Sequence, residues 1–355
     1  MRNLGSRTVN KAMPLVDSFV LANAKGGCGK TTLAFQMSCT YAARHPDVNV
    51  IVLDATSIGD TSTFFLGGTA IAQQGDGVTV STGLWYAEKL QERNLGTFTT
   101  CVEACLHNAA APGWMGRLFS RGAKTLDLDN KFARVHNLNP DIPENLFLAC
   151  GGQAPSAALS AQLDNAGARK RVTETLLQGL EEDSERWCIF ADTDGDIQFT
   201  PYTKLCLGLC RKIVVPYETN AQDVMRFSHR FVPQLREMET AGESPGDIAL
   251  IVWNKVSVSA WGKEGALSPV FKSPAEKEKE MVALNSLISD CLGHEVRCTV
   301  VPPFDSDGLL SNRVGCPFVN GPKSQMKFSK KCDELNAVFD HVIALLEQDP
   351  ERLFH

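Results

Sequence analysis

Short apolar runs that end at glycines or acidic residues alternate with amphipathic segments along most of the chain. Residues 18–24 form the first run, and 31–44 then carry apolar residues at helical spacing. The next run, 48–55, contains Asp54 near its end. Further strands are expected at 144–152, 186–192, 211–218, 247–254 and 295–304, and helices at 83–93, 157–182, 221–239, the later part of 268–290 and 324–347. This alternation predicts an α/β fold with a doubly wound, mostly parallel sheet and flanking helices.

The length and continuity of the pattern indicate one domain. The chain has 355 residues, enough for one large α/β domain or two ordinary ones. No repeat or clear linker interrupts the pattern, so we predict a single domain over 18–347. An N-terminal extension at 1–17 precedes it, and a tail at 348–355 follows it. Residues from about 60 to 140 are less regular and partly glycine-rich, and we interpret them as an insertion or an elaborated switch region.

Composition narrows the functional class only modestly. The formal net charge is -6, which gives no global indication of nucleic-acid binding but leaves room for a local basic patch. No uninterrupted apolar stretch reaches about 18 residues, so we expect no membrane insertion and a cytoplasmic location. The N-terminus is basic without a compact apolar block, which argues against a secretory signal. A short transit peptide is the alternative there.

Twelve cysteines are scattered through the chain, mostly within apolar runs. That distribution predicts reduced, buried thiols rather than a disulfide framework. Cys101 and Cys105 have CxxxC spacing, as do Cys206 and Cys210, and each pair would share one helix face. A metal or cluster site is the alternative to apolar packing, although the CxxC…CxxC spacing of zinc sites is absent.

The segment LANAKGGCGKTT, residues 21–32, has the pattern of a phosphate-binding loop. It follows an apolar strand and opens a helix, so backbone N–H groups and the helix N-terminus can surround an anion. Lys30 would reach the β- and γ-phosphates, and the Thr31 hydroxyl would hold Mg²⁺. The predicted cofactors are therefore ATP and Mg²⁺. The residues assigned to the nucleotide in this loop are Gly26, Gly27, Cys28, Gly29, Lys30, Thr31 and Thr32.

Two details distinguish this loop from the general pattern GxxxxGK[ST]. Asn23 occupies the position of the first glycine, and Lys25 adds a second lysine in KGGCGKT. The later segments VLDATSIGDTS, CIFADTDGD, IVVPYE, LIVWNK and TVVPPFDSD follow in an order and rough spacing that also fit one family. Over 18–346 the chain resembles the ParA/MinD, or deviant Walker A, family of P-loop ATPases, and most of all the ParA partition ATPases.

The resemblance implies roles for residues at the strand ends. Asp192 matches the family's Walker B carboxylate and would hold Mg²⁺ through water, with Asp54 beside it in a metal-binding and catalytic role. Asn254 would contact the adenine with its amide, and Pro302, with the following proline, would cover the base. Pro216 matches a proline that is characteristic of the family.

The extra lysine implies a dimer. In the family this lysine crosses a subunit interface to the partner's nucleotide, so Lys25 is assigned a catalytic role together with Lys30. A cation at that position neutralises phosphate charge much as an arginine finger does. The resemblance therefore implies an ATP-dependent homodimer that sandwiches its nucleotides. A lysine that only closes its own loop is the simpler reading.

The second motif departs from the family at one position. Asp54 matches its first acid, but Thr56 stands where the acid that positions the attacking water is expected. A threonine hydroxyl cannot replace a carboxylate in orienting water or accepting a proton. We therefore expect weak ATPase activity, with Asp60 or Asp194 as the substitute acid.

Several functions within the family stay open at this point. A ParA-like protein would bind DNA non-specifically and respond to a DNA-bound partner, and this requires clustered cations. A MinD-like protein would need a basic amphipathic tail, whereas the tail here is short and acidic. A cluster-handling relative would need CxxC spacing, and an ATP-locked binding scaffold would need no turnover. The basic residues available for DNA are Arg169, Lys170, Arg171, Lys323, Lys327, Lys330 and Lys331.

Overall fold

A central sheet of eight strands organises the protein. In the computed structural model the described residues are 15–73, 79–92, 96–108, 132–183, 185–256, 258–261, 269–271, 274–323, 328 and 331–348. The sheet order is β12-β9-β8-β1-β7-β2-β6-β5. The strands are β1 (Leu15–Leu21), β2 (Asn49–Ala55), β5 (Ala133–Arg134), β6 (Leu146–Ala149), β7 (Trp187–Thr193), β8 (Lys212–Glu218), β9 (Asp247–Asn254) and β12 (Cys298–Val301).

All neighbouring strands in this sheet are parallel except β5, which pairs antiparallel with β6. The predicted doubly wound, mostly parallel α/β fold is therefore confirmed. Two small antiparallel pairs lie outside the sheet, formed by β3 (Ile71–Gln73) with β4 (Thr79–Ser81) and by β10 (Val258–Trp261) with β11 (Pro269–Phe271).

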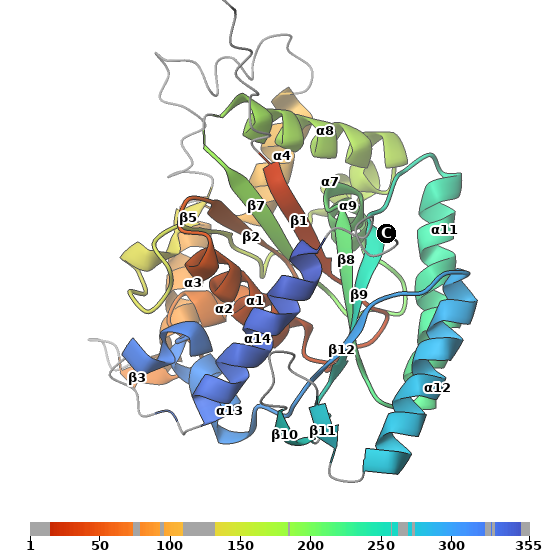
Figure 1. The fold of residues 1–355 in the computed structure, drawn as a ribbon. Coiled ribbons are helices and arrows are strands. Elements are labelled where there is room, and N and C mark those ends of the chain that lie inside the picture. Colours follow the sequence, from red (N-terminus) through yellow and green to blue (C-terminus); the bar gives the residue numbers. More distant parts are fainter. Residues whose placement is uncertain are drawn as a thin grey trace, which may run out of the picture.

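Helices cover both faces of the sheet (Figure 1). On one face α1 (Lys30–Arg44) packs beside α14 (Lys331–Glu347), and Figure 1 shows α14 running across the strands. The other helices and helical turns are α2 (Asp60–Phe65), α3 (Thr82–Glu92), α4 (Phe98–Asn108), η1 (Val135–Asn137), α7 (Ala157–Leu163), α8 (Ala166–Glu182), α9 (Pro201–Leu209), α10 (Ala221–Arg226), η2 (Phe227–Phe231), α11 (Val232–Thr240), α12 (Pro274–Leu292), α13 (Asp305–Val314) and η3 (Phe318–Lys323).

The strands are apolar on both sides because each face of the sheet carries its own core. In β1, for example, Phe19 and Leu21 contribute to the core under α1 and α14, whereas Val20 points into the opposite core. Successive side chains of a strand point to opposite faces, so a strand covered on both faces must be apolar throughout. This is why the sequence shows short continuous apolar runs at these strands.

Several element boundaries differ from the sequence prediction for local reasons. The helix expected at 157–182 is two helices, because Ser156 caps α7 and Asn165 caps the first turn of α8. The helix expected at 221–239 contains the π-helical turn η2. The last helix begins at Lys331 within the described residues, and β1 begins at Leu15, inside the predicted N-terminal extension.

The parallel arrangement places the loops after β1, β2, β7, β8 and β9 at one edge of the sheet, which is the usual location of ligand sites in such folds. In the described part of the insertion at about 60–140, β5 extends the sheet and α2 follows the loop after β2. A search of the described residues for an apolar helix long enough to cross a bilayer finds none.

Candidate nucleotide-binding site

The phosphate-binding loop connects β1 to α1 at the carboxyl edge of the sheet. Gly29 sits before the first helical residue in a left-handed conformation with φ of 90°, and no side chain caps the helix. The first N–H groups of α1 are therefore left for another acceptor. Gly26 and Gly27 are exposed, and a Cβ added to either would meet no atom within 4 Å. The loop thus combines a helix N-terminus with open space, as an anion site requires.

Lys30 is held inside this loop by the loop's own backbone and by the side chain of Asn23. Its ammonium is buried and donates to the Oδ1 atom of Asn23 at 3.2 Å and to the carbonyl of Lys25 at 3.0 Å. The loop after β7 closes against it, since a Cβ on Gly195 would lie 2.6 Å from Nζ of Lys30 and 2.3 Å from the Lys25 carbonyl oxygen. Lys30 is therefore a preorganised cation at the centre of the loop.

Thr31 and Asp192 form the arrangement expected of a magnesium site. The Thr31 hydroxyl donates to Oδ2 of Asp192 at 2.8 Å, and the Thr61 hydroxyl donates to the same oxygen at 2.6 Å. Oδ1 of Asp192 is buried and has no hydrogen-bond partner. Burial, together with the nearby charge of Asp54, raises the pKa of Asp192 to about 7. A buried carboxylate oxygen without a hydrogen-bond partner, next to a hydroxyl group, fits a hydrated divalent cation. Such a cation would favour the ionised form of Asp192.

Asp54 ends up beside Asp192, because the two residues pair in the register of β2 and β7. Its Oδ1 accepts from the N–H and the hydroxyl of Thr56, and its Oδ2 accepts from the N–H and the hydroxyl of Ser62. Burial raises the pKa of Asp54 even so, although these hydrogen bonds oppose the shift. The bonds make Asp54 the centre of the loop after β2. Its predicted roles at the metal and in catalysis stay predictions.

Thr56 is buried and turns its hydroxyl inward, toward Asp54. The hydroxyl donates to Oδ1 of Asp54 at 2.6 Å and accepts from the N–H of Gly59 at 3.0 Å. Thr56 therefore shapes the turn into α2 rather than facing the phosphate loop. Of the two substitute acids, Asp60 is exposed at the start of α2, whereas Asp194 is half-buried and accepts hydrogen bonds from Ser57.

Lys25 forms two ion pairs within its own chain. Its ammonium donates to Oε2 of Glu218 at 3.1 Å and to Oδ2 of the fully buried Asp223 at 3.0 Å. Burial disfavours the ammonium, but these carboxylates outweigh that effect and raise the pKa of Lys25. Lys255 donates to the other oxygen of Glu218 at 2.7 Å and to the carbonyl of Gly27 at 2.9 Å. The loop is thereby tied to the ends of β8 and β9.

Comparison with solved structures gives significant matches along nearly the whole chain. Apo McdA from Cyanothece is 16% identical, with a TM-score of 0.58, over 94% of this chain and 99% of that one. An ATP complex of a McdA variant from Cyanothece is 15% identical, with a TM-score of 0.56, over 94% and 97%. A putative plasmid partition protein from Borrelia burgdorferi bound to AMPPNP is 11% identical, with a TM-score of 0.50, over 93% and 97%.

The fold is that of the ParA/MinD P-loop ATPases. No family profile matches the sequence, and no curated protein is significantly similar to it. The resemblance seen in the motifs is therefore confirmed at the level of the fold.

The ends of β9 and β12 carry the two residues that the sequence predicts to contact the adenine. Asn254 is buried, and its Nδ2 donates to the carbonyl of Cys28 at 2.7 Å while its Oδ1 accepts from the N–H of Lys255. Asn254 pairs with Val301, so Pro302 follows directly beside it. In the structure Asn254 braces the phosphate loop, and its predicted contact with adenine stays a prediction.

Several site residues went unassigned in the sequence reasoning. Thr61 lies within the segment VLDATSIGDTS, and Glu218 ends the segment IVVPYE, but neither motif by itself indicates a role for these two residues. Asp223 follows five residues later, in a first helical turn capped by Asn220. Only the spatial proximity of these acids to Lys25 indicates their function.

The basic residues that the sequence offers for DNA binding differ in their exposure to solvent. Arg169 is buried and paired in a fork with Glu243, with Nε donating to Oε1 at 2.6 Å, so its prediction as a DNA contact is wrong. Lys170 is exposed and lies 4.0 Å from Glu174 on the same helix. The side chains of Lys323, Lys327, Lys330 and Lys331 lie outside the described residues.

The paired cysteines are all buried on helices or directly after them. Cys101 and Cys105 are buried on α4, Cys206 is buried on α9, and Cys210 is buried directly after it. Among the described residues no group of three or more His, Cys, Asp or Glu side chains could hold a metal ion.

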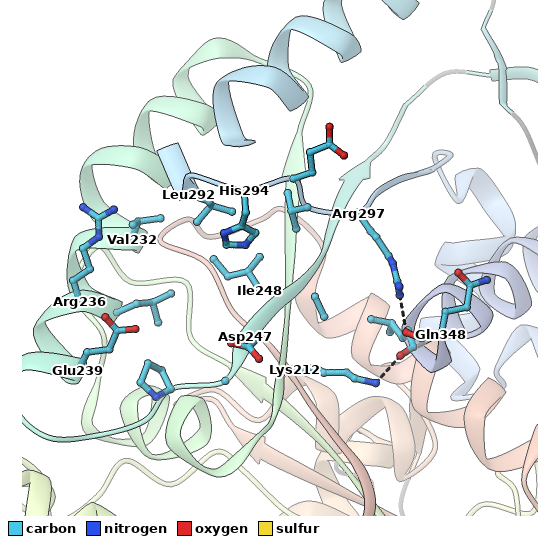
Figure 2. A pocket seen from close by; sticks show the side chains of 17 residues that line it. Lys212, Val232, Arg236, Glu239, Asp247, Ile248, Leu292, His294, Arg297 and Gln348 are labelled. Atoms are coloured by element: carbon cyan, nitrogen blue, oxygen red, sulfur yellow. Dashed lines mark hydrogen bonds between the residues drawn. The ribbon is translucent and has the colours of Figure 1, made fainter. Parts of the chain in front are cut away.

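A cavity of about 770 Å³ opens where β9 starts, at the sheet edge opposite the phosphate loop, and it is lined by charged groups of both signs (Figure 2).

Proposed function

We propose that this protein is an ATP-binding member of the ParA/MinD family that dimerises around Mg²⁺-ATP, hydrolyses it slowly and acts in partition of a plasmid, a chromosome or another cargo. The proposal that the protein binds a nucleotide rests on the hydrogen bond between Thr31 and Asp192 beside the uncapped N-terminus of α1. The unpartnered Oδ1 of Asp192 supports a hydrated Mg²⁺ there. When bound, Mg²⁺ would neutralise charge that develops on the phosphates during transfer.

A second copy of the chain is the partner that the surface around the loop favours. Ile58, Ile197 and Met225 are 74%, 64% and 57% exposed. They follow β2, β7 and β8, so the strand order places them at the same edge of the sheet as the phosphate loop and Lys25. Exposed apolar side chains grouped near a site are typical of an interface. A subunit placed there would bring its own Lys25 toward the other subunit's nucleotide.

In this proposal Lys25 exchanges partners when the dimer forms. In the single chain its charge is satisfied by Glu218 and Asp223. Phosphate oxygens of a nucleotide across the interface would offer acceptors of the same kind, so the exchange need not leave a buried ammonium unpaired.

The test is the size of the protein with Mg²⁺ and AMPPNP, measured by light scattering after gel filtration. We expect wild type to become dimeric and Lys25→Ala to stay monomeric. The control Lys170→Ala, at an exposed lysine on α8, should dimerise normally. If wild type binds AMPPNP but stays monomeric at micromolar concentration, the sandwich-dimer proposal is wrong.

An ATP-locked binding scaffold is the second candidate function. The inward turn of Thr56 favours it, because that side chain adds no acceptor for an attacking water beside the phosphate loop. ATP turnover measured with and without DNA separates the two functions. A gel shift at two salt concentrations tests DNA binding independently, since phosphate contacts weaken steeply with salt.

A further inference from the structure

The carboxylate that is missing at Thr56 has a counterpart directly after the neighbouring strand β7, at Asp194. In the register of β2 and β7, Asp54 pairs with Asp192 and Ala55 pairs with Thr193. The next residues, Thr56 and Asp194, therefore leave the sheet side by side. The N–H of Ser57 confirms this closeness, since it donates to both oxygens of Asp194 at 3.1 and 3.3 Å.

Asp194 is also held against the phosphate loop. Its neighbour Gly195 packs directly on the loop, where an added Cβ would lie 2.6 Å from the Lys30 ammonium. Burial raises the pKa of Asp194, and the hydrogen bonds from Ser57 and the positive charge of Lys30 oppose that shift. Neither Asp60 nor Asp196 combines these features, because both are exposed and no hydrogen bond or ion pair joins them to the loop in the described part of the chain.

The carboxylate keeps room for another donor. Oδ1 of Asp194 accepts two hydrogen bonds from Ser57, one from the N–H at 3.1 Å and one from the hydroxyl at 3.3 Å. Oδ2 receives only the longer contact from the N–H. An ionised carboxylate offers about four lone-pair positions, so Oδ2 of Asp194 can accept a hydrogen bond from water. Asp54, by contrast, already receives two hydrogen bonds at each oxygen.

We propose that Asp194 is the catalytic carboxylate that orients the attacking water, in place of the carboxylate absent at Thr56. This rests on the proposed ATPase function. One water O–H donates to Asp194 while the water oxygen forms a bond to the γ-phosphorus. The bond from that phosphorus to the β–γ bridging oxygen breaks, ADP takes its electron pair, and the water proton ends on the released phosphate. The charge of Lys30 offsets the repulsion between Asp194 and the phosphates.

The experiment follows the lifetime of the nucleotide-dependent dimer by light scattering after excess ATP is removed. With Mg²⁺-ATP, Asp194→Asn should prolong the dimer at least about tenfold over wild type, because a neutral amide is a weaker acceptor than a carboxylate and its nitrogen cannot accept from water. With AMPPNP the two lifetimes should be equal. A thermal shift with Mg²⁺-ADP should match wild type, which checks that the site folds and binds.

Two further variants separate catalysis from support of the loop. Ser57→Ala removes the hydroxyl contact but keeps the carboxylate, and Asp60→Asn removes the other acid; both should give the wild-type lifetime. If Asp194→Asn decays like wild type, or if it loses the ADP shift, the assignment is wrong while the dimer stands. If wild type does not dimerise with AMPPNP, the proposed function fails first, and the inference with it.

Discussion

Replacing Asp192 by asparagine should stabilise the metal-free protein at neutral and alkaline pH. Asp192 is completely buried, and burial with the nearby charge of Asp54 raises its pKa from 3.8 to about 7. Between these values the folded chain holds a proton that the unfolded chain has released. The free energy of unfolding therefore falls as pH rises from about 4 to about 7 and changes no further from this group above that.

The size of the effect follows from the shift. About three pKa units correspond to ~4 kcal/mol at 1.36 kcal/mol per unit, which is an upper bound for Asp192. Part of that energy belongs to the Asp54–Asp192 pair, so we expect Asp192→Asn to raise the free energy of unfolding at pH 8 by ~2 kcal/mol. The amide oxygen can still accept from the hydroxyl groups of Thr31 and Thr61, so their hydrogen bonds are kept.

The assay is urea unfolding with a chelator at pH 5 and at pH 8. Asp192→Asn should exceed wild type at pH 8, and the excess at pH 5 should be only about a third as large, because pH 5 lies about a third of the way from the unfolded pKa to the folded pKa of Asp192. Asp196→Asn, at an exposed acid in the same loop, is the matched control and should be neutral at both pH values. Adding Mg²⁺ with AMPPNP should stabilise wild type at pH 8 and leave Asp192→Asn nearly unchanged.

Two results would refute the reasoning. If Asp192→Asn is less stable than wild type at pH 8 in chelator, the buried charge is not the unfavourable element that the structure implies. If Asp192→Asn gains as much stability from Mg²⁺ and AMPPNP as wild type does, the unpartnered oxygen is not where the metal acts.

Two further predictions test the closure of the loop and the buried ion pair. Gly195→Ala should weaken AMPPNP binding at least about tenfold in calorimetry, because the new methyl group would lie 2.6 Å from the Lys30 ammonium. The control Gly208→Ala, whose methyl group would meet no atom within 4 Å, should bind AMPPNP normally. Equal affinities of the two variants would contradict the close packing of Gly195 on the loop. Arg169→Ala should lower the free energy of unfolding, measured in urea, by about 3–5 kcal/mol, because it leaves the Glu243 carboxylate buried without its partner. A loss below about 1 kcal/mol would show that the Arg169–Glu243 ion pair does not stabilise the fold.

The strands, the loop between β1 and α1 and the positions of its threonine and lysine were predictable because each is encoded by contiguous residues. An apolar run followed by GGCGKT specifies strand, turn and helix start within 12 residues, and Lys30 and Thr31 take their positions from that local geometry. Asp192 could be placed at a strand end in the same way. Boundaries were less certain where a cap interrupts a long polar helix, as Asn165 does before α8.

By itself the sequence determined the fold class and singled out the loop with the pattern of a phosphate-binding loop, because hydrophobic periodicity and short motifs are local properties of the chain. Only the tertiary structure decided which distant groups meet. The register of β2 and β7 sets Asp194 beside Thr56, and the packing of β8 against β1 brings Glu218 to Lys25. Likewise, only the structure shows that Arg169 is buried in an ion pair with Glu243, whereas the sequence alone leaves it as a possible DNA contact. Strand register and burial depend on the assembled sheet, and no short segment encodes them.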